Sequence, residues 1–195
     1  MTKFATREEW LIAAIEELNE HVFLPHELTL PAYRVSVGWP GGRGKKTNTV
    51  GQCWNSSSTE DGTPAIFISP KVKNPIEVLS ILVHEVIHAI DDCASGHRGA
   101  FLKMFRKVGM VGKATQSQAG DELLLTLSKI EDRLGKYPHS AMKNPSAGTG
   151  EKKQGTRMLK VMCADEDCGY SLRTTRQWLD VGLPTCPCGS EMLEV

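Results

Sequence analysis

The stretch His-Glu-Val-Ile-His at residues 84–88 stands inside a run that is otherwise almost wholly apolar. This run opens with Asn74 and Pro75, which are typical of a helix N-cap followed by proline at the first helical position. The sequence therefore predicts a buried helix from Pro75 to about Asp92, which breaks near Gly96. Histidines four residues apart project from the same face of a helix, close enough to bind one metal ion.

A catalytic zinc site explains why two imidazoles and a carboxylate lie on such a helix. Glu85 is adjacent to His84, where it can act as general base toward a metal-activated water. Catalytic zinc takes three protein ligands and keeps one open position. His97 lies nine residues after His88, just beyond Gly96, where the chain can turn back towards the metal. This pattern favours His84, His88 and His97 as ligands.

Two alternatives stay open on the sequence alone. The histidines can be buried residues whose ring nitrogens are satisfied by hydrogen bonds. Asp92 lies one turn beyond His88 on the same predicted face, so it is an alternative third ligand, a residue that orients a ligand, or a solvated helix end. Three ligands in line on one helix span about 12 Å and cannot all reach one ion at ~2 Å, which favours His97.

The remaining pattern predicts an α+β fold. Thr6 and Glu9 form a capping box at the start of a first helix of about four turns. Alternating apolar and polar residues at 33–39 are typical of a half-buried strand. Further strands are expected at 49–54 and 64–69, and further helices, ended by Gly109 and Gly135, at 101–108 and 123–134.

Four late cysteines predict a second, metal-bound unit at 157–195. They form two close pairs separated by 17 residues, which is typical of a zinc ribbon with a tetrahedral thiolate site: Cys163 and Cys168, then Cys186 and Cys188. A unit of about 40 residues is too small to rest on a hydrophobic core, so metal binding would supply most of its folding free energy. The spacings C-x4-C and C-x-C differ from the usual C-x2-C, and unrelated free thiols are the alternative. Cys53 and Cys93 lack a partner at metal-ligand spacing and are interpreted as small core residues.

Composition sets the wider expectations. The 23 basic and 23 acidic side chains give a net charge of zero, so any basic surface must be local. No run of about 18 apolar residues occurs, and the start lacks the pattern of a signal peptide. We therefore expect a cytoplasmic protein, neither secreted nor bound to a membrane, whose six cysteines are reduced and favour metal over disulfides. Residues 138–156 lack periodicity and are rich in Gly, Ser, Pro and Lys, which predicts a flexible linker after a domain at 1–137.

The segment HEVIHAIDDCASGHRGAFLKMFRKVG resembles the SprT-like (Spartan) metalloprotease family. That family has H-E-x-x-H, a short variable insert, and Gly-His-x-x-x-Phe on the next helix. The matching residues here are His84, Glu85, His88, Gly96, His97 and Phe101. An upstream Gly-x-Cys-Trp strand, here Gly51, Cys53 and Trp54, and an apolar strand ending in Ser-Pro at 66–70 are also similar. The resemblance covers roughly residues 5–112.

The resemblance implies a zincin-like domain and zinc-dependent proteolysis. The implied ligands are His84, His88 and His97, with Glu85 as catalytic acid and base, and the strand near 65–69 is where an extended substrate chain would pair. Well-studied members cut proteins attached to DNA, are stimulated by DNA, and often end in a zinc ribbon. We therefore expect two Zn²⁺ ions per chain, one catalytic and one structural. The expected partners are a protein substrate and DNA that is single-stranded or contains junctions. A DNA-directed protein of this kind is expected to be associated with the nucleoid or located in the nucleus.

Two other functions compete with a protease acting on DNA-associated proteins. One is a DNA-binding module whose metal is only structural, but the intact Glu85 argues against it. The other is a zinc peptidase with a non-DNA role, in which the ribbon recruits a protein partner. Aromatic and basic side chains of the ribbon either contact nucleic acid or form a small core and a solvated face: Tyr170, Arg173, Arg176 and Trp178. Basic residues in and near the linker mildly favour DNA: Lys143, Lys152, Lys153, Arg157 and Lys160.

Overall fold

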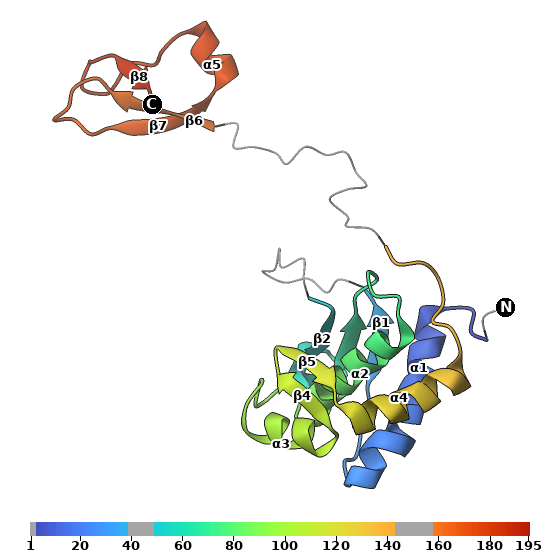
Figure 1. The fold of residues 1–195 in the computed structure, drawn as a ribbon. Coiled ribbons are helices and arrows are strands. Elements are labelled where there is room, and N and C mark those ends of the chain that lie inside the picture. The colour runs from blue at the N-terminus through green and yellow to red at the C-terminus, as the bar shows by residue number, and fades with distance from the viewer. Residues whose placement is uncertain (1–2, 39–48, 143–157) are drawn as a thin grey trace. The chain divides into compact units, whose positions relative to one another are not determined.

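The structure is a computed structural model that describes residues 3–38, 49–142 and 158–195 (Figure 1). The chain divides into two compact units, Met1–Asn144 and Pro145–Val195. Both helices and small sheets occur in the described residues, so the predicted α+β class is confirmed. None of the described helices is both long and apolar enough to cross a membrane.

A three-stranded mixed sheet lies in the first unit. Its strands are β1 (Arg34–Val37), β2 (Gly51–Trp54) and β3 (Ala65–Ile68), in the order β1-β3-β2. β1 runs parallel to β3, and β2 runs antiparallel to it. The strand predicted from alternation at 33–39 and the two further strands expected at 49–54 and 64–69 are therefore present. β3 is the central strand, and β2 lies at one edge of the sheet.

The histidine-bearing helix, α2 (Pro75–Ile90), is the centre of the first unit. Asn74 caps it by accepting a hydrogen bond from the Glu77 backbone N–H at 3.0 Å, as predicted. Its apolar residues are buried around most of its circumference, and it contacts β2, β3 and the helices α1 (Arg7–Leu18), α3 (Gly99–Lys107) and α4 (Asp121–Leu134). A helix packed on so many sides is held rigidly. The backbone positions from which the side chains of α2 project are therefore fixed.

The first helix begins at the predicted capping box. Thr6 accepts from the Glu9 backbone N–H at 3.1 Å, and the Glu9 carboxylate accepts from the Thr6 N–H at 3.2 Å. α1 ends at Leu18 and continues as a π-helical turn, Asn19–Phe23, and a 3₁₀ turn, Leu24–His26. The predicted helix of about four turns is therefore present, with its last turn widened.

The first unit also holds the beginning of the segment expected to be a linker. Arg7 is buried, and its guanidinium donates to the carbonyl oxygens of Pro138 at 2.9 Å and Pro70 at 3.0 Å. Charged donors to buried carbonyls are among the stronger hydrogen bonds. The chain near Pro138 is therefore anchored beside α1. The rest of the expected linker, 143–156, lies outside the described residues.

A short hairpin not predicted from the sequence connects α3 and α4. It consists of β4 (Met110–Lys113) and β5 (Gln116–Ala119), paired antiparallel. Its strands are four residues long, with Gly112 and alternating polar residues, so the apolar periodicity that reveals longer strands is missing. The helices on either side, α3 and α4, correspond to those expected at 101–108 and 123–134.

The second unit is a small sheet with one short helix. β6 (Met158–Cys163) pairs with β7 (Ser171–Thr175) on one side and β8 (Met192–Glu194) on the other, and α5 (Arg176–Val181) follows β7. The buried cluster of this unit consists of Val161, Cys186 and Met192. So small a core cannot offset the conformational entropy of ordering the chain. A further source of stability is required.

Candidate metal centres

The structure brings the three predicted histidine ligands together. His84 and His88 project from one face of α2, and His97 lies in the turn before α3. The Nε2 atoms form a nearly equilateral triangle, with sides of 3.1 Å from His84 to His97, 3.2 Å from His88 to His84, and 3.2 Å from His88 to His97. Three imidazole nitrogens therefore face one point.

This triangle fits a tetrahedral metal ion better than a hydrogen-bond network. Each neutral imidazole carries one proton and one lone pair. When three such nitrogens face one another, at least two of them are of the same kind, both N–H groups or both lone pairs. Those two cannot form a hydrogen bond with each other. Ligand nitrogens ~2.0–2.1 Å from a tetrahedral zinc lie about 3.3 Å apart, close to the distances found. These residues could hold a metal ion, with a fourth position left for a water or substrate.

Burial keeps two of the ligands in the protonation state that metal binding needs. Desolvation and the neighbouring histidines lower the pKa of His84 to about 3. Desolvation and His97 likewise lower the pKa of His88 to about 4. Both imidazoles are therefore neutral near pH 7. A metal does not have to compete with a proton for them until the solution is strongly acidic.

Phe101 on α3 fixes the orientation of all three rings. Its fully buried ring stacks on His88 with a centroid distance of 4.2 Å, and it meets His84 and His97 edge-on at 5.1 and 5.2 Å. The last residue of the Gly-His-x-x-x-Phe pattern thus forms the packing layer behind the ligands.

Ser117 on β5 contacts the outer nitrogen of His84, a role that sequence reasoning missed. Its Oγ lies 3.1 Å from His84 Nδ1, while Nε2 points to the ligand triangle. A partner on the second ring nitrogen fixes the tautomer and orientation of a ligating histidine. This contact depends on the hairpin. No signal in the sequence links Ser117 to a histidine 33 positions away.

Glu85 is buried beside the ligand triangle. Its side chain is 6% exposed, and desolvation, together with the nearby Cys93, raises the pKa of its carboxyl group to about 8. A bound divalent cation would lower this pKa again, because it favours the charged carboxylate. A carboxyl group poised in this way is suited to accept and return a proton near neutral pH.

The edge strand β2 passes directly over Glu85, which explains why residue 51 is a glycine. A Cβ atom on Gly51 would lie 2.5 Å from Glu85 Oε1 and 2.6 Å from Ile81 Cγ2. Real contacts of this kind are never so short. The strand can therefore approach the carboxylate only where the side chain is a single hydrogen.

We expect Gly51→Ala to disturb the site while Gly38→Ala does not. The added methyl group forces β2 away from α2 or rotates Glu85, at a cost of about 1–3 kcal/mol in folding stability. A Cβ on Gly38 meets no atom within 4 Å. Thermal unfolding of the two variants, measured with metal bound, checks this prediction. Equal melting temperatures would contradict the close approach of β2 and Glu85.

Asp92 does not lie where the sequence predicted. α2 ends at Ile90, and Asp92 follows in a left-handed conformation with φ of 47°. Its carboxylate accepts hydrogen bonds from the Ser56 backbone N–H at 2.6 Å and the Ser56 hydroxyl at 2.7 Å, which lower its pKa. The prediction that Asp92 shares a helical face with His84 and His88 is therefore wrong. It ties the end of α2 to the loop after β2.

An open cleft of about 920 Å³ runs over the ligand triangle. Residues 49–53 of the β2 region line one side, residues 114–117 of the hairpin line another, and His84, Glu85 and His88 lie on α2 between them. A cleft of this size can hold several residues of an extended peptide, next to the three histidines and Glu85.

The strand available to pair with a ligand in this cleft is β2, not β3. β3 pairs with β1 along one edge and with β2 along the other, so it has no free edge for a further strand. The expectation that a substrate adds to the strand near 65–69 is therefore wrong. The Ser69 N–H donates to the Val50 carbonyl at 2.9 Å, so these residues form a hydrogen-bonded pair. Such pairs alternate along antiparallel strands. The backbone groups of Gly51 and Cys53 therefore point away from β3, toward the free edge.

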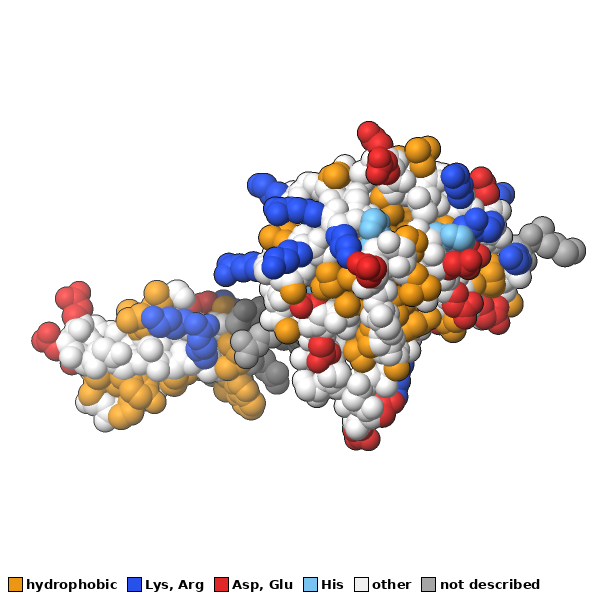
Figure 2. All heavy atoms as spheres, turned by 90° about the horizontal axis from the view of Figure 1, so that it is seen from below, with side chains coloured by type: hydrophobic (Ala, Val, Ile, Leu, Met, Phe, Trp, Pro, Cys, Tyr) orange, Lys and Arg blue, Asp and Glu red, His pale blue; other side chains and the backbone are white. Residues whose placement is uncertain are grey.

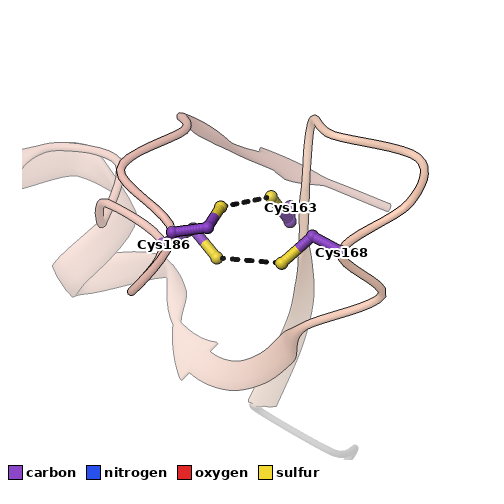
Figure 3. Close-up of side chains that lie close together, drawn as sticks. Cys163, Cys168 and Cys186 are labelled. Atoms are coloured by element: carbon purple, nitrogen blue, oxygen red, sulfur yellow. Dashed lines mark hydrogen bonds between the residues drawn. The ribbon is translucent and has the colours of Figure 1, made fainter.

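The four late cysteines also converge, in the second unit (Figure 3). The sulfur atoms of Cys163 and Cys188 lie 3.6 Å apart, as do those of Cys168 and Cys186. All four lie within 4.8 Å of one another. Sulfur ligands of a tetrahedral zinc at ~2.3 Å are about 3.8 Å apart, so these thiols could hold a metal ion. That ion would cross-link the loop after β6 with the turn before β8.

We expect two metal ions per full-length chain and one in a chain that ends near residue 150. The truncation removes the four-cysteine site and leaves the first unit, which has its own core. Elemental analysis of both proteins measures the ratio. A full-length ratio of one that the truncation leaves unchanged would remove the four-cysteine assignment.

Two aromatic side chains of the second unit, the expected ribbon, are on its surface rather than in its core. Tyr170 is 43% exposed and Trp178 is 60% exposed. Arg176 pairs with the Glu194 carboxylate through both terminal nitrogens, one at 2.9 Å. The interpretation of the two aromatic residues as a small core is therefore wrong, and the salt bridge engages Arg176 within the unit.

No protein-family model, curated protein or solved structure matches this chain.

Proposed function

We propose that this protein is a zinc-dependent endopeptidase with a zincin-like, SprT-like domain, acting on DNA-associated or DNA-crosslinked proteins. The observation that carries the proposal is a buried carboxylate, Glu85, beside three converging histidines at the floor of an open cleft. A structural metal site needs neither a general base nor access for a large ligand. The non-catalytic alternative therefore leaves both features unexplained.

The roles of the protein groups follow from their positions. His84, His88 and His97 would hold the zinc, which when bound supplies a Lewis acid that activates water and polarises a peptide carbonyl. Glu85 takes the proton of the attacking water at its carboxylate and passes it to the nitrogen of the leaving amine. Ser117 and Phe101 keep the imidazoles in place during this step.

We infer that the substrate chain lies extended along β2. The N–H and C=O of Gly51 and the N–H of Cys53 face away from β3 and offer it main-chain hydrogen bonds, while the Cys53 carbonyl accepts from the Cys93 thiol. Such bonds are independent of side-chain identity. Among the described residues that line the cleft, Glu85 and the histidines are the only ionisable ones apart from Cys53 and Cys93. Both features favour a protease with broad sequence preference that needs an unfolded or flexible segment.

A local basic surface supports DNA as a partner. No Asp or Glu occurs between Asp92 and Asp121, so this part of the chain carries only positive charges of its own, of which Lys107 pairs with Glu27 at 3.5 Å. Figure 2 shows several Lys and Arg side chains gathered along one side of the larger unit. The exposed cations of the segment are Arg98, Lys103, Arg106, Lys107 and Lys113. Because His97 and the hairpin that lines the cleft belong to the same segment, DNA bound here would lie near the site.

The exposed aromatic residues of the ribbon suit the same partner. Tyr170 and Trp178 offer faces on which unpaired bases can stack, which is typical of single-strand binding. The same exposure suits a protein partner, which is the basis of the second candidate: a zinc peptidase whose ribbon recruits a protein. Part of the argument for DNA rests on basic residues of the expected linker. Those at 143–157 lie outside the described residues.

A cleavage assay with a DNA-bound basic protein tests the proposal. We expect the zinc-loaded protein to cleave this substrate, and added single-stranded DNA to increase the rate. The Glu85→Gln variant, at equal concentration, is the control for a contaminating protease. Cleavage that DNA leaves unchanged would favour the peptidase with a non-DNA role. No cleavage under any condition would overturn the protease.

Reversing the charge of two cations on α3 is expected to weaken the effect of DNA. The double substitution Lys103→Glu and Arg106→Glu would remove two contacts to phosphates and add repulsion. The slope of the logarithm of the DNA-binding constant against the logarithm of the salt concentration should therefore become shallower by about two. Lys129→Glu on α4 is the matched control, because Lys129 is also exposed but lies outside the basic segment. Fluorescence anisotropy at several salt concentrations measures the slope. Equal slopes for both proteins would exclude α3 as the DNA surface.

A further inference from the structure

Two cysteines outside the metal centres meet in the wall of the cleft. Cys53 belongs to the edge strand β2, and Cys93 lies in the turn after α2, 40 positions later. The Cys93 thiol donates to the Cys53 carbonyl oxygen at 3.5 Å. Both side chains line the cleft, and both are partly exposed. Cys53 packs against the core of the first unit, in agreement with its interpretation as a small core residue, whereas Cys93 does not belong to that core.

We propose that Cys53 and Cys93 are a redox modification site, at which a peroxide converts the two thiols into a reversible disulfide that closes down the cleft. The formation of the bond stands on the geometry of the two side chains. Its inhibitory effect rests on the proposed peptidase function.

The chemistry balances with a peroxide as the oxidant. The Cys93 thiolate attacks one peroxide oxygen, so that an S–O bond forms, the O–O bond breaks, and one water leaves after protonation. The Cys53 sulfur then attacks the resulting sulfenic acid. The S–S bond forms, the S–O bond breaks, and a second water leaves with the Cys53 proton. The two sulfurs together lose two electrons, and the two peroxide oxygens gain them.

The pair is suited to this reaction in a way that the ribbon cysteines are not. Cys93 lines the open cleft and its thiol contacts the edge strand at Cys53, so a peroxide that enters the cleft can reach it. Its resolving partner is already adjacent. The four ribbon cysteines converge on one another, and a bound metal would protect their thiolates. Among the described residues, Cys53 and Cys93 belong to neither candidate metal cluster.

The disulfide would move the turn that precedes the third histidine ligand. A disulfide requires the two sulfurs to lie ~2.05 Å apart, and the Cys93 sulfur now lies at hydrogen-bonding distance, 3.5 Å, from the Cys53 carbonyl oxygen. β2 cannot tilt further onto α2, because Gly51 already touches Glu85. The turn must therefore move towards β2. The Cys93 N–H donates to the His88 carbonyl at 2.8 Å, and His97 lies four residues further on, so the shift reaches both ligands and narrows the cleft.

Peptide mapping tests the bond without any measurement of proteolysis. The zinc-loaded, full-length protein is treated with hydrogen peroxide, its free thiols are alkylated, and it is digested with trypsin. Cys53 and Cys93 are each the only cysteine of their tryptic peptides, 47–71 and 74–98. We expect these two peptides joined, with the loss of two hydrogen atoms, and separated again by dithiothreitol. Recovery of both as separate alkylated peptides, under conditions that oxidise added glutathione, would overturn the proposal.

Cleavage of an unfolded protein, measured before and after peroxide, tests the consequence. A shift of about 1 Å at a catalytic site can cost ~10²-fold in rate, and we expect a loss of about 10- to 100-fold that dithiothreitol reverses. Cys93→Ser is the matched control, because its hydroxyl can still donate to the Cys53 carbonyl while the disulfide cannot form. If the disulfide forms and the rate is unchanged, the inhibitory role is wrong. If the reduced protein does not cleave at all while the joined peptides still appear, it is the proposed protease function that fails.

Discussion

Replacing Glu85 with glutamine is expected to lower the rate of peptide cleavage by ~10²- to 10⁴-fold, the usual effect of losing a general base. The amide has nearly the same shape as the carboxylate, so it fits beneath Gly51 without disturbing β2. It cannot take a proton from the attacking water. Substrate binding along β2 should be unaffected, so the loss should appear in kcat rather than in KM.

Metal content separates this effect from a damaged site. Glu85 does not belong to the converging set of His84, His88 and His97, so the variant should keep two metal ions per chain. Its folding stability should be unchanged or slightly higher, because a buried ionisable group is replaced by a neutral one. Cleavage at the rate of the unsubstituted protein would show that the proposed mechanism is wrong.

Most of the helical framework could be predicted because its signals are local. The capping residues Thr6 and Asn74 and the apolar periodicity of α2 act over a few residues, and the structure has these elements at the expected places. The grouping of the histidines follows in part from the same local geometry, since two of them are one turn apart on α2. A third ligand was accessible to reasoning because Gly96 permits a turn directly after the helix.

The errors concern features that depend on tertiary structure. Which strand of a small sheet is central cannot be read from three short apolar runs, so the sequence does not reveal that the strand near 65–69 is the central β3 and that β2 is an edge strand. The position of Asp92 depends on its hydrogen bonds with Ser56, which lies 36 residues away in a polar loop. The contact between Ser117 and His84 requires the β4–β5 hairpin to fold back over α2. None of these has a local signature.

The contrast between Asp92 and His97 is the basis of the second large expected effect. His97→Ala should lose the metal of the first unit and all cleavage activity, and the metal content should fall from two ions per chain to one. Losing a residue that is hydrogen-bonded to a metal ligand typically lowers metal affinity by ~10- to 100-fold. Losing one of the three ligands themselves should lower it further. The metal that remains should be the one held by the four ribbon cysteines, whose sulfur cluster belongs to a separate unit.

Asp92→Ala should keep both metal ions. Its carboxylate is engaged with Ser56 rather than with an imidazole, so its loss should remove two hydrogen bonds at the end of α2 and leave metal content unchanged. Both variants are compared by elemental analysis after dialysis, with circular dichroism as the test of folding. His97→Ala removes a ring that packs edge-on against Phe101, so a folded protein with one metal ion is the informative result. If Asp92→Ala loses the metal and His97→Ala keeps it, the ligand set and the resemblance to SprT-like proteases must both be withdrawn.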